Sequence, residues 1–152
     1  MQPDTSALQV VVVGGGSVGL LYAARLALAG QSVTVVTRSS LQANQLMEQG
    51  LWLHSLDGQK NRVNVQAQPI ADGLPEGNLY LLTVKQPDLP SLLPALAEIP
   101  PYARVIALQN GMGHQELLAS VLEDAQCYFA IHTEGARRHS ATEVEHTGTG
   151  TL

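Results

Sequence analysis

A glycine-rich turn near the start of this 152-residue sequence constrains its fold more than any other feature. Residues 8–13 form a β-branched, almost wholly apolar run, and residues 14–19 follow it with the sequence GGGSVG. Residues 18–29 are rich in Ala and Leu, Gly30 is placed to end a helix, and residues 32–37 form a second β-branched run. This order of strand, glycine turn, helix and strand predicts a βαβ unit.

The turn matches the pattern G-x-G-x-x-G, in which the three spaced glycines have separate roles. Gly14 permits the tight turn, Gly16 lets the backbone approach a pyrophosphate, and Gly19 lets the helix pack closely on the strand. The phosphate then lies against unpaired N–H groups at the positive end of the helix. A glycine-rich turn without a ligand is the alternative, but the flanking strand and helix favour dinucleotide binding. The residues predicted to bind the cofactor here are Gly14, Gly15, Gly16, Ser17, Val18 and Gly19.

The residue after the second predicted strand indicates which dinucleotide binds. Folds of this kind that prefer NAD place an acid roughly 20 residues after the glycine motif, where it holds the ribose hydroxyls. This sequence has Arg38 there, followed by Ser39 and Ser40, either of which could add a hydroxyl. A guanidinium binds a 2′-phosphate through charge-assisted bonds, whereas a carboxylate repels it. An ordinary solvated arginine is the alternative, and the glycine motif favours NADP(H) as the cofactor.

The rest of the sequence alternates between strand-like and helix-like segments. Asp57-Gly58 predicts a β-hairpin between two of the strands. Strands are predicted at residues 51–55, 62–67, 78–84, 104–108 and 126–131, and helices at residues 41–49, 91–98 and 114–122. Pro94 falls in the first turn of the second helix if Ser91 caps it, and kinks the helix if it begins earlier. The alternation predicts one α/β domain over residues 1–152, with a Rossmann-like doubly wound, mostly parallel sheet and a hairpin excursion.

Two polar residues follow predicted strands at the edge of the sheet where ligands bind. Lys85 comes directly after residues 78–84, and Asn110 comes shortly after residues 104–108. Ligands of open α/β sheets bind at the carboxyl ends of the strands, beside the glycine turn. A lysine there can donate to ribose or substrate oxygens, and an asparagine can hold an amide or a carboxylate. A surface lysine and an asparagine in a turn before glycine stay open as alternatives.

Composition and charge exclude several other classes of function. The net charge is −5 and the only adjacent basic pair is Arg137-Arg138, which argues against nucleic-acid binding. No apolar run approaches the ~20 residues of a membrane span, and the N-terminus has no signal-peptide core. The single cysteine, Cys127, lies in a predicted strand as a core residue, and its lack of a disulfide partner fits a reducing cytoplasm. No metal-site spacing is formed by the three histidines that recur every seven residues, His132, His139 and His146.

Together these residues resemble the N-terminal domain of the 2-dehydropantoate 2-reductase family, whose members are also called ketopantoate reductases. The resemblance covers essentially the whole chain, in the family's order. The features that carry it are the glycine motif, Arg38, Lys85 in LLTVK, Asn110 in NGMG, Ala136-Arg137-Arg138, and HTGTG at residues 146–150.

The resemblance implies an NADPH-dependent reduction of 2-dehydropantoate to pantoate, a step of pantothenate and coenzyme A synthesis. Residues 14–19, Arg38, Lys85, Asn110 and Ala136 would contact the cofactor, and Lys85 and Asn110 would also face the substrate. Relatives of the family reduce other 2-keto acids, so another small-molecule 2-keto acid is an open alternative as substrate.

The family also has a helical C-terminal domain, which supplies the catalytic lysine that donates the proton. This sequence ends at Leu152 inside a strand-like run, residues 149–152. We therefore expect a truncated NADP(H)-binding domain that contains no catalytic residue and is inactive alone. A non-catalytic NADP(H)-sensing module is the alternative from another class, and the strand-like ending argues against it. Arg38 argues against a methyltransferase that holds S-adenosylmethionine in its glycine turn.

Overall fold

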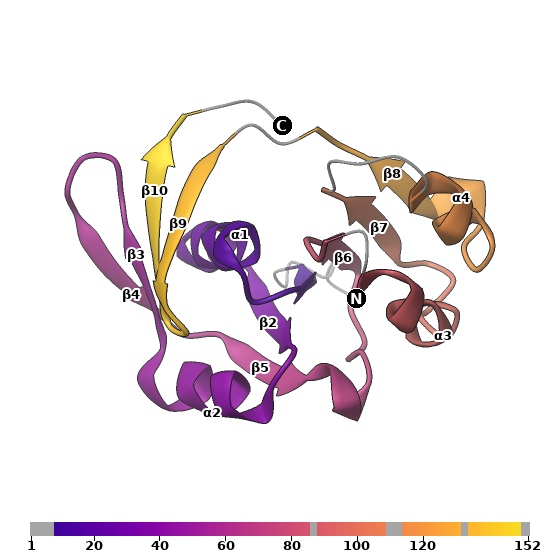
Figure 1. Ribbon diagram of the computed structural model, residues 1–152, viewed down its shortest axis with the longest axis horizontal. Helices are drawn as coiled ribbons and strands as arrows, with labels where there is room; N and C mark the ends of the chain where they lie inside the picture. The colour runs from indigo at the N-terminus through magenta and orange to yellow at the C-terminus, as the bar shows by residue number, and fades with distance from the viewer. Residues whose placement is uncertain (1–7, 86–87, 109–113, 132–133, 150–152) are drawn as a thin grey trace, which may run out of the picture.

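The computed structural model describes residues 8–85, 88–108, 114–131 and 134–149 of the chain. Its strands are β1 (Gln9–Val13), β2 (Ser32–Thr37), β3 (Leu51–His54), β4 (Lys60–Val63), β5 (Gln66–Pro69), β6 (Leu79–Leu82), β7 (Arg104–Ala107), β8 (Cys127–Phe129), β9 (Gly135–Ser140) and β10 (Glu143–Gly148). Its helices are α1 (Ser17–Leu28), α2 (Ser40–Gln49), α3 (Leu93–Leu96) and α4 (His114–Ala119), with 3₁₀ turns η1 (Ile70–Asp72), η3 (Pro90–Leu92) and η4 (Asp124–Gln126). These elements form two sheets with helix α1 between them (Figure 1).

A six-stranded sheet in the order β5-β2-β1-β6-β7-β8 forms the centre of the fold. All of its strand pairings are parallel. Val10 of β1, for example, lies opposite Val33 of β2 on one side and Leu79 of β6 on the other. The chain runs outward from β1 to β2 and β5 and then returns to β6, so the strand order reverses between β1 and β6. The predicted doubly wound parallel sheet is therefore confirmed, and such sheets bind ligands at this reversal.

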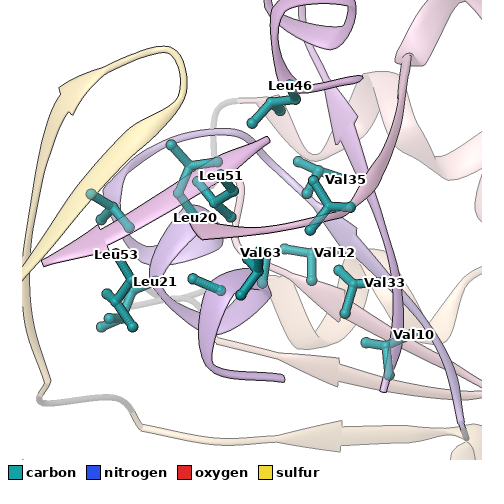
Figure 2. Packing of buried hydrophobic residues seen from close by; sticks show 14 of the residues in the cluster. Val10, Val12, Leu20, Leu21, Val33, Val35, Leu46, Leu51, Leu53 and Val63 are labelled. Atoms are coloured by element: carbon teal, nitrogen blue, oxygen red, sulfur yellow. The ribbon is translucent and has the colours of Figure 1, made fainter. Parts of the chain in front are cut away.

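Different helices cover the two faces of this sheet. Because side chains alternate along a strand, Val10 and Val12 enter the core cluster on one face, and Val11 and Val13 enter the cluster on the other. Side chains from α1, α2 and the second sheet build the first cluster, which Figure 2 shows. Side chains from α3 and α4 build the second cluster. Strand β1 is thus buried on both faces, as its unbroken apolar sequence predicts.

A second sheet of four strands, in the order β4-β3-β10-β9, lies on the other side of α1 (Figure 1). Strands β3 and β4 form the hairpin predicted from Asp57-Gly58, in which the Ser55 N–H donates to the Gln59 carbonyl oxygen at 2.8 Å. Strand β10 pairs parallel with β3 and antiparallel with β9. The predicted hairpin excursion is therefore half of a sheet whose other half comes from near the end of the chain.

Two predicted strands differ from the structure. The strand predicted at residues 62–67 is divided, because the chain crosses between sheets there: β4 ends at Val63 in the second sheet, and β5 begins at Gln66 in the first. The strand predicted at residues 149–152 is wrong at its first residue, since β10 ends at Gly148 and Thr149 lies beyond it. Residues 150–152 lie outside the described part of the chain.

The helix predicted over residues 91–98 is shorter in the structure. The 3₁₀ turn η3 precedes the four-residue helix α3, and Pro94 lies in the first turn of α3, where a missing N–H costs little. Ser91 does not cap this helix, because its hydroxyl donates to the Asp88 carbonyl oxygen at 2.8 Å. Within the described ranges, no helix has the length and apolar content needed to cross a membrane.

Candidate functional site

Two glycines of the predicted motif are required by the protein's own packing. Gly14 follows β1 with φ +126°, a value that glycine adopts readily, and its N–H donates to the Val36 carbonyl oxygen at 2.9 Å. A Cβ atom on Gly19 would lie 2.0 Å from the Gly14 carbonyl oxygen and 2.7 Å from Oγ1 of Thr83. Helix α1 can therefore follow β1 this closely only with glycine at both positions.

Gly16 differs from these two, because its protein surroundings leave room for a side chain. No heavy atom lies within 4 Å of the position that its Cβ would take. Its φ of −84° and ψ of −167° are extended values open to any residue, and it is the N-cap of α1 without a side-chain cap. The first turn of a helix leaves N–H groups without intrahelical partners, at the positive end of the helix dipole. The space at Gly16 thus fits the anionic group that the motif predicts.

Two side chains that the sequence analysis did not select hold the turn in place. Gln42, which is buried, donates through Nε2 to the carbonyl oxygens of Gly15 at 2.9 Å and Ala141 at 3.1 Å. Arg138 donates through Nη1 to the same Gly15 oxygen at 3.0 Å. The Ser39 hydroxyl caps α2 by accepting from the Gln42 N–H at 3.2 Å. Serine followed three residues later by glutamine is a capping-box signature, and this signal could have marked the position.

Thr83 joins the ends of the two strands at the reversal point. Its N–H and its hydroxyl both donate to the Val13 carbonyl oxygen, at 3.0 and 2.9 Å. The carboxyl ends of β1 and β6 are therefore held side by side, directly below the glycine turn.

Arg38 lies where the sequence predicts it, directly after β2, and its side chain is 82% exposed. Its Nη2 atom lies 2.7 Å from Oδ2 of Asp88, whose side chain is 42% exposed. Asp88 follows β6, and its N–H donates to the Lys85 carbonyl oxygen at 2.9 Å. This ion pair connects the ends of the two strands that flank β1, and no local pattern in the sequence points to it.

The remaining predicted site residues, Lys85, Asn110 and Ala136, differ in how the structure describes them. Lys85 is exposed beyond the end of β6, and its ammonium group forms no ion pair with any residue that the structure describes. Asn110 lies outside the described residues. Ala136 lies in β9 opposite His146 and packs against the first core cluster. Within β9, it is Arg138 that contacts the glycine turn.

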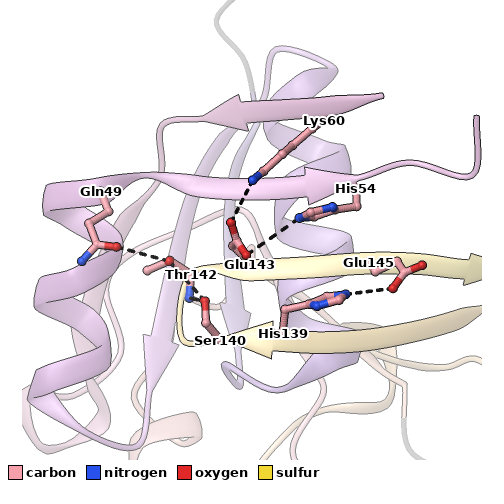
Figure 3. Close-up of polar contacts among 8 residues, drawn as sticks. All are labelled: Gln49, His54, Lys60, His139, Ser140, Thr142, Glu143 and Glu145. Carbon is pink, nitrogen blue, oxygen red and sulfur yellow. Dashed lines mark hydrogen bonds and ion pairs between the residues drawn. The ribbon is translucent and has the colours of Figure 1, made fainter. Parts of the chain in front are cut away.

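The second sheet carries a polar network of its own, which Figure 3 shows. His54 and His139 stack with their ring centroids 5.2 Å apart, and Nε2 of His139 lies 2.8 Å from Oε1 of Glu145. Lys60 Nζ lies 3.1 Å from Oε1 of Glu143. The hydrogen bond from His139 lowers the pKa of the Glu145 carboxyl below its ordinary value. The His139–Glu145 contact joins the neighbouring strands β9 and β10, whereas the His54–His139 and Lys60–Glu143 contacts each reach across one intervening strand.

His146 belongs to a different cluster, beside the last turn of α1. Its Nε2 atom hydrogen-bonds Oε2 of Glu134, and Nη1 of Arg25 lies 3.4 Å from Oε1 of the same carboxylate. The hydrogen bond from His146 holds the pKa of Glu134 below its ordinary value, so this carboxylate is ionised at neutral pH. Among the residues described, no three His, Cys, Asp or Glu side chains are placed to hold a metal ion. His132 lies outside them.

Cys127 is partly buried against the second core cluster, at the start of β8. Burial raises the pKa of its thiol above the ordinary value. A protonated, packed thiol is a poor nucleophile, which agrees with the core role predicted for it.

Sequence comparison relates the chain to a family of reductases. A family model described as "Ketopantoate reductase PanE/ApbA" matches residues 10–152. The 2-dehydropantoate 2-reductase of Bacillus subtilis (strain 168) is 37% identical over 145 residues, which are 95% of this chain and 47% of that protein. The enzyme of the same name from Listeria monocytogenes serovar 1/2a is 34% identical, over 94% of this chain and 48% of that protein. The chain spans about half the length of these relatives.

Solved structures agree with this relationship. The crystal structure of a probable 2-dehydropantoate 2-reductase from Bacillus subtilis superimposes with a TM-score of 0.83 at 38% identity, over 94% of this chain and 47% of that one. A D-mandelate dehydrogenase in complex with NADH and anilino(oxo)acetate has a TM-score of 0.86 at 19% identity, over 93% of this chain and 46% of that one, and shares the fold. On the evidence of its glycine turn, its strand order and these matches, the chain belongs to the ketopantoate reductase family.

Proposed function

We propose that this chain is the NADPH-binding part of an oxidoreductase that reduces 2-dehydropantoate to pantoate, in pantothenate and coenzyme A synthesis. The observation that carries the proposal is the open space at Gly16, in a turn whose other two motif glycines are required by packing. Membership of the family supports the reaction, because the named relatives are 2-dehydropantoate 2-reductases. The single free cysteine fits a reducing cytoplasm as the compartment.

The glycine turn would hold the pyrophosphate of the cofactor. N–H groups in the first turn of α1 supply the donors, and the helix dipole favours the negative charge. Gln42 and Arg138 fix the Gly15 carbonyl oxygen, so the turn has its shape before a ligand arrives. When bound, the nicotinamide supplies the hydride for the reduction.

Arg38 supports NADPH over NADH as the cofactor. Its guanidinium is exposed at the end of β2, where a fold of this kind that prefers NAD carries an acid instead. A guanidinium presents several donors to the oxygens of a 2′-phosphate, and these bonds are charge-assisted.

Lys85 would hold the keto-acid substrate or the ribose next to it. Its exposed ammonium lies beyond the carboxyl end of β6, on the edge of the sheet that carries the glycine turn. A positive charge there attracts the carboxylate of a 2-keto acid, and the three N–H donors can orient it. Asn110 is proposed as a second ligand-holding residue on the same edge, and Ala136 as a further cofactor contact.

Titration of the chain with NADPH, by calorimetry or nicotinamide fluorescence, tests the proposal. Gly16→Val should abolish binding and leave the fold intact, because the side chain would fill the space for the pyrophosphate. Gly148→Val is the matched control, since Gly148 also has no heavy atom within 4 Å of a Cβ and lies in β10 of the second sheet. This control should bind NADPH like the parent.

Unchanged binding by a folded Gly16→Val variant would show that the turn is only structural. If the parent chain binds NADPH and Gly16→Val does not, the next step is to assay the full-length protein for its substrate. Oxidation of NADPH by that protein with 2-dehydropantoate, but not with unrelated ketones, is the expected result. A preference for a different 2-keto acid would move the assignment to that substrate, and NADPH binding without any turnover would support a sensing module instead.

A further inference from the structure

The ion pair at the end of β2 sets a carboxylate against the residue that would recognise the cofactor's 2′-phosphate. We propose that Asp88 competes with this phosphate for Arg38, and so determines how strongly the chain prefers NADPH over NADH. This inference rests on the proposed function, because it needs a dinucleotide in the site. It assigns a specificity role to a residue outside the glycine motif and outside β2.

The geometry shows that the competition is direct. Oδ2 of Asp88 lies 2.7 Å from Nη2 of Arg38, which is the distance of a charge-assisted hydrogen bond. A 2′-phosphate that binds Arg38 must either displace this carboxylate or lie beside it. Displacement breaks an existing ion pair, and a neighbouring position brings two anions together. Either route weakens the binding of NADPH and has no counterpart for NADH, which has no 2′-phosphate.

The backbone keeps Asp88 in this position without help from Arg38. Its N–H donates to the Lys85 carbonyl oxygen at 2.9 Å, and its own carbonyl oxygen accepts from the Ser91 hydroxyl at 2.8 Å. Asp88 thus belongs to the start of the η3 segment, while Arg38 projects from β2 with a side chain that is 82% exposed. These hydrogen bonds hold the backbone of Asp88, and its side chain, 42% exposed, is the less exposed of the two partners.

A carboxylate at this place also provides what NADH requires. Folds that prefer NAD use an acid near the end of the second strand to accept from the ribose hydroxyls. Asp88 reaches the same corner from β6, the strand on the opposite side of β1. The end of β2 therefore holds one residue that favours NADPH, Arg38, and one that favours NADH, Asp88. The ratio of the dissociation constants for the two cofactors depends on both residues.

The test compares the dissociation constants for NADPH and NADH in the parent and in Asp88→Asn. Asparagine keeps the size of the side chain and removes the charge, so NADPH should bind about two- to fivefold more tightly, the range for an exposed ion pair. NADH should bind equally or more weakly. The gain for NADPH should shrink at high salt, because the pair is exposed and screened.

Asp57→Asn is the matched control. It changes the net charge equally, and an Asn-Gly turn suits the β3–β4 hairpin as well as Asp-Gly does. This variant should leave the ratio of the two dissociation constants unchanged.

The outcomes separate the inference from the proposed function. If the parent binds NADPH but Asp88→Asn has the same ratio of constants as Asp57→Asn, the role of Asp88 is refuted and the cofactor assignment stands. Weaker NADPH binding in Asp88→Asn would also refute it, because Asp88 would then be orienting Arg38 for the phosphate. A parent that binds neither dinucleotide would overturn both.

Discussion

At the scale of single residues, the glycines of the turn have two different roles, one in packing and one in binding. Gly14 and Gly19 leave no space for a Cβ beside Thr83 and the backbone of the turn, so a substitution there acts on folding. Gly16 faces open space, so a substitution there acts on whatever occupies that space. The same sequence pattern therefore contains a structural part and a binding part, and the two can be separated by experiment.

Gly19→Ala should lower the free energy of unfolding by roughly 1–3 kcal/mol, the usual effect of overpacking. The added Cβ would lie 2.0 Å from the Gly14 carbonyl oxygen, which must then move. Gly16→Ser, at a helix N-cap where serine is favoured, should change that free energy by about 0.5 kcal/mol or less. Urea unfolding of the parent and both variants measures this, and equal losses in the two variants would contradict the division of roles.

Arg38→Ala should weaken NADPH binding by about 1.5–3 kcal/mol, the contribution of a hydrogen bond to a charged group. NADH binding should be almost unaffected, because the ribose hydroxyl offers no charge for Arg38 to pair with. Arg104→Ala is the control, because Arg104 begins β7 and so lies at the amino ends of the parallel strands, whereas Arg38 follows the carboxyl end of β2. Calorimetric titration with both cofactors is the measurement. Equal affinities of the parent for NADPH and NADH would argue against this role.

At the scale of elements, the strands buried on both faces could be predicted almost to their ends. The sequence predicts β2 over the residues that form it, because a β-branched run between turn residues is a local signal. Strand β9 has no such signal, since its sequence GARRHS is mostly polar and it pairs with β10 along an exposed face. The sequence also does not predict the break between β4 and β5, because no glycine or proline marks the point where the chain crosses between the sheets.

The candidate site, too, has one part that local sequence patterns predict and another part that they do not. The glycine turn and Arg38 belong to a single βαβ unit, so spacing along the chain predicts them. The long-range contacts that they make join residues 27, 123 and 50 positions apart: Gln42 with Gly15, Arg138 with Gly15, and Arg38 with Asp88. Only the folded chain brings these residues together.

Gln42→Leu should reduce the free energy of unfolding by about 1–3 kcal/mol, because two hydrogen bonds of about 0.5–1.5 kcal/mol each are lost. The substitution removes the two hydrogen bonds that join α2 to the glycine turn and to Ala141, and it keeps the helix and the side-chain volume. Gln45→Leu, on a more exposed face of α2, is the control and should change stability by less than about 0.5 kcal/mol. Urea unfolding gives both values. The same loss in the two variants would mean that helix propensity, and not the contact, is responsible.

At the scale of the whole molecule, helix α1 is held from both sides. The parallel sheet packs on one side and the second sheet on the other, so the helix that carries the glycine turn at one end has little freedom to move (Figure 1). Arg138 of the second sheet donates a hydrogen bond to Gly15, just before α1. Glu134, which precedes β9, forms an ion pair with Arg25 in the last turn of α1. Such a preformed site loses less conformational entropy when a ligand binds.

Glu134→Gln should destabilise the chain at neutral pH but not in acid. In the folded state the hydrogen bond from His146 lowers the pKa of Glu134 below its ordinary value of 4.5, and Arg25 favours the ionised form in the same direction. A depressed carboxyl pKa contributes stability above 4.5, and this contribution is lost as the pH falls through the lower folded value. The gap in urea midpoint between parent and variant should therefore be widest near neutral pH, and it should close as the pH falls from 4.5 through the lower pKa of the folded state. Glu145→Gln is the matched control, because Glu145 has a histidine partner too but is 37% exposed, against 12% for Glu134, so its gap should be smaller. A gap for Glu134→Gln that stays constant from neutral pH into acid would mean that the side chain stabilises the sheet through packing and not through its charge.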